Sequence, residues 1–214
     1  MLKVLTPNPE TDSDRPATPE ALKKELFRKT FHLCTLLYLG AFLVLGPDRV
    51  MAPMLAWMAV VLAFEAVRFH TARGRAWAQR LFGFMIRGKE EAHYTGFFYT
   101  SLGALLVFAM FRSHPDVVQA SLLYLALGDS ASALVGLAWG RHPYWILGRK
   151  RTWEGSAAGF AVALAVGLVS GLSPGLTLAG ALAFSVADSV PLPPDDNVWI
   201  PVLPGAILLG AIQW

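Results

Sequence analysis

Seven apolar runs, separated by polar segments, make up most of the chain. They share a length of 15 to 23 residues and carry almost no charge. They cover Thr30–Leu45, Met51–Val67, Gly96–Phe111, Val117–Trp139, Glu154–Leu172, Leu176–Val190 and Val198–Ile212. With their flanking residues, runs of this length cross the hydrocarbon core of a bilayer as α-helices. The pattern therefore predicts an all-α, polytopic membrane protein with about seven transmembrane helices.

The polar segments divide the chain further. Residues 1–21 combine prolines with acids and hydroxyls, a composition typical of a flexible tail. We expect residues 22–214 to form a single transmembrane domain. A helix begins near Pro19, at the end of the tail, and a long polar loop follows the second run. Pro201 and Pro204 should kink the seventh helix, which neighbouring helices in a membrane can accommodate.

Composition and charge support a membrane protein and set its orientation. Hydrophobic residues make up 55% of the 214 residues, and the net charge is +3. No basic helix is interleaved with aromatic residues, so we expect no nucleic-acid partner. Seven crossings with a cytoplasmic N-terminus place 16 of the 18 Lys and Arg residues in the cytoplasm and leave only Arg49 and Arg112 outside. We expect a multi-pass protein of the cell membrane.

Small residues recur every four positions in the fourth and fifth runs. They are Gly128, Ser132, Gly136 and Gly140 in one, and Gly155, Gly159, Ala163, Gly167 and Gly171 in the other. This spacing lets two helices approach closely in lipid. It predicts direct packing of the two helices, which would bring Asp129 toward Glu154.

Asp129 lies deep inside the fourth apolar run. A carboxylate at such a depth is a candidate functional residue by default, because burying an unpaired charge in lipid is costly. It could hold Mg²⁺ or accept a proton from an alcohol. The alternative is a structural hydrogen bond between helices.

A basic segment precedes the fifth run. Arg149, Lys150 and Arg151 are followed by Thr152 as the expected N-cap, and Gly155 lies in the first helical turn. Cations beside free backbone N–H groups match the charge and geometry of a polyphosphate. The segment is equally well explained as a positive loop that sets topology.

Two further polar groups carry candidate chemistry. Asp195 and Asp196 offer the carboxylate oxygens that Mg²⁺ prefers, although capping of the seventh helix explains them equally well. Arg28, Lys29 and His32 share one face of the first helix, where the two cations could also anchor lipid headgroups. Glu65 and Arg68 have the spacing of an ion pair at the membrane edge.

Four segments, in this order, resemble the polyprenol kinase family of dolichol kinase, phytol kinase and CTP-dependent diacylglycerol kinase. They are Arg28-Lys29-x-x-His32, Gly128-Asp129-Ser130-Ala131-Ser132-Ala133 through Gly140-Arg141-His142, Lys150-Arg151-Thr152-Trp153-Glu154-Gly155-Ser156, and Asp195-Asp196-Asn197-Val198-Trp199-Ile200-Pro201. The resemblance covers roughly residues 22 to 210. It implies an integral membrane enzyme that transfers the γ-phosphoryl group of CTP, with Mg²⁺, to the hydroxyl of a lipid alcohol.

The resemblance also implies roles for individual residues. The catalytic set is Asp129, His32 and Glu154, and the metal ligands are Asp129, Asp195 and Asp196. The nucleotide-binding set is Arg28, Lys29, Ser130, Arg149, Lys150, Arg151, Thr152 and Gly155. The acceptor remains open among isoprenoid alcohols and diacylglycerol, because grooves for all of them consist of the same apolar residues.

Two other functions use an intramembrane carboxylate. A phosphatidate cytidylyltransferase also consumes CTP, but the chain lacks that family's C-terminal His-Gly-Gly…Asp-Arg element. A small transporter would use Asp129 as a coupling-ion site and would favour inverted halves, which the sequence does not show.

Overall fold

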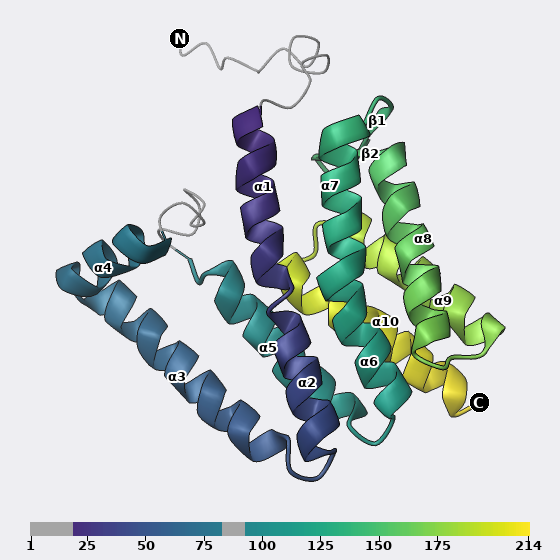
Figure 1. The fold of residues 1–214 in the computed structure, drawn as a ribbon, viewed down its shortest axis with the longest axis horizontal. Helices are drawn as coiled ribbons and strands as arrows, with labels where there is room; N and C mark the ends of the chain where they lie inside the picture. Colours follow the sequence, from purple (N-terminus) through teal and green to yellow (C-terminus); the bar gives the residue numbers. More distant parts are fainter. Residues whose placement is uncertain (1–18, 83–92) are drawn as a thin grey trace, which may run out of the picture.

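The computed structural model describes residues 19–82 and 93–214 (Figure 1). These residues form helices connected by turns, with one short β-hairpin. The elements are α1 Pro19–His32, α2 Thr35–Leu45, α3 Met51–His70, α4 Ala72–Phe82, α5 Gly96–Phe111, α6 Pro115–Leu123, the π-helix η2 Tyr124–Gly128, α7 Asp129–Trp139, β1 Pro143–Ile146, β2 Arg149–Thr152, α8 Trp153–Val169, α9 Pro174–Ser189 and α10 Asp196–Ile212. The predicted helical fold is therefore correct apart from the hairpin, and the predicted tail lies almost entirely outside the described residues.

Within residues 19–82 and 93–214, three helical segments are long and apolar enough to cross a membrane. They are Glu25–Leu45, Met51–His70 and Pro115–Trp139, and the apolar helices α5, α8 and α10 are shorter. The membrane prediction is thus supported, whereas the predicted number of seven spans is not confirmed. Large apolar side chains lie on the outside of the helices, with Leu37 72%, Val44 85% and Val169 74% exposed. Apolar surface on this scale suits contact with lipid.

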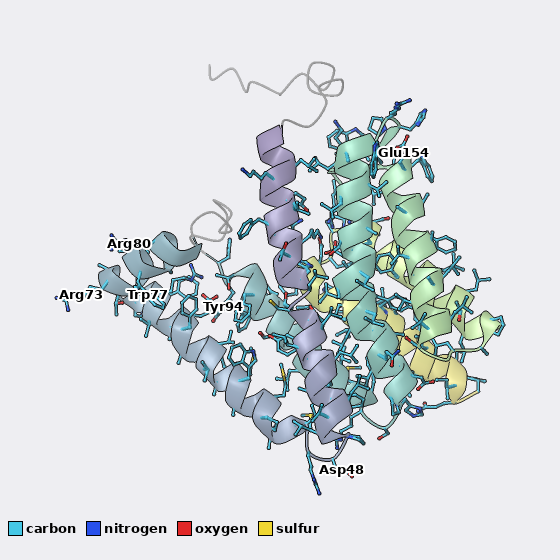
Figure 2. All side chains as sticks on the ribbon, viewed as in Figure 1. Asp48, Arg73, Trp77, Arg80, Tyr94 and Glu154 are labelled. Carbon is cyan, nitrogen blue, oxygen red and sulfur yellow. The ribbon has the colours of Figure 1, made fainter. Side chains whose placement is uncertain are left out.

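Besides the hairpin, two segments differ from the sequence prediction. The first predicted span is broken at Leu33 and Cys34, so that α1 and α2 are separate helices. The polar loop predicted after the second span contains α4, whose charged residues include Arg73 and Arg80 (Figure 2). The remainder of that loop, residues 83–92, lies outside the described part of the chain.

The core lies around α6, which packs against α2, α5 and α10. Val117, Val118, Ala120 and Leu122 have no exposed surface, so α6 is buried on several faces. The π-helix η2 continues α6 directly into α7. Its i→i+5 hydrogen bonds add one residue to the turn and change the face that the following helix presents. Asp129 is the first residue after this change.

Helices α7 and α8 pack through their small residues, as the sequence predicted. A Cβ atom on Gly155 would lie 2.6 Å from the backbone oxygen of Ser132 and 2.9 Å from the Cα of Gly136. Gly159 packs similarly against Gly128 and Ser132. Only glycine allows the two backbones this approach.

Replacing Gly155 with alanine should therefore destabilise the protein. The added methyl group meets backbone atoms that cannot rotate away, and we expect a loss of about 1–3 kcal/mol in the free energy of unfolding. Gly210→Ala is the matched control, because a Cβ there meets nothing within 4 Å. Denaturant titration of both variants in micelles measures the difference, and equal stabilities would contradict the close packing.

Glu65 and Arg68 form the ion pair that their spacing predicted, although both side chains are buried. Arg68 Nε donates to Glu65 Oε2 at 2.7 Å. Glu65 Oε1 accepts from the backbone N–H and hydroxyl of Thr95, at 3.0 and 2.6 Å. Thr95 is also the N-cap of α5, so the pair fixes the start of α5 on α3.

Candidate functional site

A buried charged cluster joins α1 to α7, two helices that lie side by side in Figure 1. The ammonium of Lys29 donates a hydrogen bond to Asp129 Oδ2, and His32 Nδ1 lies 2.9 Å from the same oxygen. Lys29, His32 and Asp129 are 3%, 6% and 5% exposed. We call these three residues the Asp129 cluster.

Local sequence explains the cluster. Lys29 and His32 lie one turn apart on one face of α1, and that face turns toward α7. A buried carboxylate is stable only when a cation and hydrogen bonds compensate it. The sequence identified all three residues as candidates but did not show that they meet. A carboxylate within a membrane needs a counter-charge. That requirement was the signal that could have indicated contact between Asp129 and the cations of the first helix.

Arg28 and Ser130 are adjacent in sequence to cluster residues but engage other groups. Arg28 pairs with Glu25, with Nε donating to Oε2 at 3.0 Å. The Ser130 hydroxyl donates to the backbone oxygen of Ala126, at 2.7 Å, within the π-helical segment. The structure therefore brings neither of these predicted nucleotide-binding residues to the Asp129 carboxylate.

The basic segment forms a β-hairpin instead of a loop. Strands β1 and β2 pair antiparallel with Ile146 opposite Arg149. They are joined by Leu147 and Gly148, which both have positive φ, as tight hairpins require. A two-residue turn ending in glycine was the missed signal.

The hairpin separates its three cations onto two faces, because alternate side chains of a strand point in opposite directions. Arg149 and Arg151 are partly buried on the face toward α9 and α10. Lys150 is exposed on the other face, opposite Trp145. The two arginines lie among carboxylates, whereas Lys150 does not share their face.

Asp188 is a candidate functional residue that sequence reasoning missed. It lies near the end of α9, is 2% exposed, and pairs with Arg151 at 2.6 Å. Its other carboxylate oxygen accepts from the Ser132 hydroxyl at 2.7 Å. An acid inside the sixth apolar run was the available signal.

The start of α8 is capped as predicted, but its acidic residue lies elsewhere than expected. The Thr152 hydroxyl accepts from the backbone N–H of Gly155 at 3.2 Å. Glu154 pairs with His142 at 2.6 Å, at the hairpin end of the bundle (Figure 2). Helices α7 and α8 run antiparallel, so the residue of α8 that lies level with Gly128 is Gly159. Glu154 lies more than one turn away from that level, toward the hairpin. The expectation that helix packing brings Glu154 to Asp129 is therefore wrong.

The predicted metal ligands on α10 have protein partners. Asp195 caps α10 by accepting from the backbone N–H of Asn197 at 3.1 Å, and Asp196 pairs with Arg149 at 2.6 Å. Across residues 19–82 and 93–214, no three His, Cys, Asp or Glu side chains are grouped as metal ligands. The magnesium site at Asp129, Asp195 and Asp196 stays a prediction.

This geometry can support chemistry on an anion and a hydroxyl. The Asp129 carboxylate can accept a proton from an alcohol, because Lys29 and His32 hold it in place. Two arginines on one hairpin face can bind phosphate oxygens, since each guanidinium has more donors than one carboxylate uses. The two arginines and the Asp129 cluster belong to one helical bundle. Arg149 pairs with α10 and Arg151 pairs with Asp188 of α9, which in turn accepts a hydrogen bond from α7.

Fold and site together define a helical membrane protein with a buried Lys–Asp–His cluster and a basic hairpin. The chain is 30% identical over 142 residues to CTP-dependent diacylglycerol kinase 1 of Eremothecium gossypii. That match covers 65% of this chain and 44% of the relative. The chain is also 34% identical over 67 residues to a phytol kinase of Synechocystis. That match covers 31% of this chain and 29% of the relative.

Both relatives are polyprenol kinase family members, and they confirm the resemblance indicated by the motifs. The chain matches less than half the length of either relative. No protein-family model matches the chain. No solved structure matches it either.

Proposed function

We propose that the protein is a lipid kinase that transfers the γ-phosphoryl group of CTP to the hydroxyl of a membrane lipid alcohol. The observation that carries the proposal is the Asp129 cluster, in which a buried carboxylate is held by two residues of the first motif. The similarity to two lipid kinases, one named as CTP-dependent, supports the donor and the reaction.

Phosphoryl transfer needs positioning and neutralisation of charge more than covalent chemistry by the protein. Asp129, or His32 beside it, receives the proton of the acceptor hydroxyl. Arg149 and Arg151 bind the triphosphate from the hairpin, and the capped start of α8 at Thr152 adds backbone N–H donors. Lys29 holds the Asp129 carboxylate in place through its hydrogen bond to Oδ2.

Mg²⁺ fits this donor set in part. Asp195 and Asp196 are adjacent carboxylates beside Arg149, and protein-bound Mg²⁺ commonly takes one or two carboxylates together with substrate phosphates. When bound, the ion would neutralise charge on the β- and γ-phosphates. Asp129 is the third predicted ligand.

The acceptor is a lipid whose chain lies in the bilayer and whose hydroxyl reaches the cytoplasmic edge. Isoprenoid alcohols and diacylglycerol both meet this requirement, and the names of the two relatives include one of each class. The cytoplasm holds CTP, so we place the hairpin end there. Glu154 at that end and Asp48 at the other lie far apart along the bundle (Figure 2).

Product analysis tests the proposed reaction. Purified protein is incubated with CTP, Mg²⁺ and either a panel of lipid alcohols or phosphatidate. The alcohols should yield CDP and a lipid monophosphate, which phosphorus NMR distinguishes. A cytidylyltransferase would instead release pyrophosphate with phosphatidate and leave CMP on that lipid. A transporter would leave CTP intact, and either of these results would contradict the kinase.

A further inference from the structure

A chain of buried and partly buried hydrogen bonds joins the hairpin to the helix that carries Asp129. It runs from Arg151 on β2 to Asp188 on α9 and on to Ser132 on α7. Arg151 donates to Asp188 Oδ1 at 2.6 Å and also to the backbone oxygen of Asp188. Ser132 donates to Asp188 Oδ2 at 2.7 Å. Ser132 lies one turn after Asp129, so Asp188 links the arginine to the Asp129 cluster.

Asp188 is costly to bury and has no role in the proposed reaction. The side chains of Asp188 and Arg151 are 3% and 11% exposed. Removing one partner of such a pair leaves an uncompensated charge, whereas apolar residues could replace both without loss of stability. Hence stability alone does not explain the pair. A function for Arg151 that requires a fixed guanidinium explains it.

The Arg151 guanidinium is only partly used by Asp188. One terminal nitrogen makes both contacts to Asp188, and Nε is buried with no hydrogen-bond partner within residues 19–82 and 93–214. An unpaired buried donor is unfavourable, so a ligand oxygen that pairs with it gains binding free energy. A phosphate group offers such an oxygen.

Neither of the other hairpin cations is held in this way. Arg149 pairs with Asp196, and both side chains are more than a quarter exposed. Lys150 is exposed on the opposite face of the hairpin. Arg151 is therefore the cation whose position the surrounding protein determines most completely.

We propose that Asp188 is a positioning residue for the donor nucleotide. It fixes the Arg151 guanidinium so that its free N–H groups donate to phosphate oxygens of CTP, and it ties that arginine to Ser132 and so to Asp129. Arg151, more than the exposed Lys150, then determines the affinity for CTP. This inference rests on the proposed function, because it assumes that CTP is the donor.

The test measures equilibrium binding of CTP by calorimetry, without lipid acceptor, so that turnover does not enter. Asp188→Asn should weaken CTP binding about 10-fold or more, the loss expected for one charge-assisted contact. In an Arg151→Ala background the same substitution should change affinity less than about 2-fold, because Asp188 acts through Arg151.

Two further variants guard against a folding defect. Asp188→Glu keeps the charge but displaces the guanidinium by about one methylene group, and should bind CTP more weakly while remaining folded. Thr177→Val removes another buried polar group of α9 and should leave CTP affinity unchanged.

The outcomes separate this inference from the proposed function. If wild type binds CTP and Asp188→Asn or Asp188→Glu binds it equally well, the positioning role is wrong and the kinase stands. Equal losses in the wild-type and Arg151→Ala backgrounds also overturn it, since Asp188 then acts independently of Arg151. A wild-type protein that binds no CTP overturns both.

Discussion

Asp129→Asn should lower the rate of lipid phosphorylation by about 10²–10⁴-fold, the range for loss of a general base. The amide has the size of the carboxylate but cannot accept a proton from the acceptor or ligate Mg²⁺ as an anion. Rates measured at saturating CTP and Mg²⁺ check this. Turnover like that of wild type would make Asp129 a purely structural residue.

The single variant needs a control for folding, because it leaves Lys29 buried without its counter-charge. Breaking a buried pair costs about 3–5 kcal/mol, whereas replacing both charges with groups of similar volume is often neutral. The double variant Asp129→Asn, Lys29→Met should therefore recover the stability that Asp129→Asn loses. It should remain inactive, which separates loss of chemistry from loss of fold.

Glu65→Ala should destabilise the protein by about 3–5 kcal/mol. The carboxylate is 1% exposed, and its removal breaks the buried ion pair with Arg68. Two hydrogen bonds from Thr95 at the start of α5 are lost as well. Denaturant titration in micelles measures the effect.

Asp48→Asn is the control for Glu65→Ala, because Asp48 is an exposed acid in the turn after α2. Its effect should stay within about 0.5 kcal/mol, as for most surface substitutions. Glu65→Gln keeps an acceptor for Thr95, and its loss of stability should lie between those of Glu65→Ala and Asp48→Asn. Equal stability of Glu65→Ala and Asp48→Asn would show that the buried ion pair contributes nothing.

The sequence predicted those features that depend on local pattern. The apolar runs predicted most of the helices, and the four-residue spacing of small residues predicted the contact between α7 and α8. Thr152 and Asp195 cap α8 and α10 as their positions indicated. Each of these follows from residues close together in the chain, which sequence periodicity reports directly.

Features that depend on distant segments were not predictable in the same way. Lys29 and Asp129 are 100 residues apart, and only the packing of α1 on α7 brings them together. The hairpin places Lys150 on the face opposite the two arginines. The sequence shows only three consecutive cations and does not reveal this separation. Asp188 gained its partners from β2 and α7, neither of which is near it in sequence.

Transfer of label from CTP to lipid tests the central claim most directly. Purified protein is incubated with CTP labelled on the γ-phosphate and with isoprenoid alcohols or diacylglycerol, and the lipid is then extracted and counted. We predict label in a lipid monophosphate for the wild type and almost none for Asp129→Asn, Lys29→Met. Label that appears only in pyrophosphate or stays in CTP, or that reaches lipid equally with both proteins, would contradict the account.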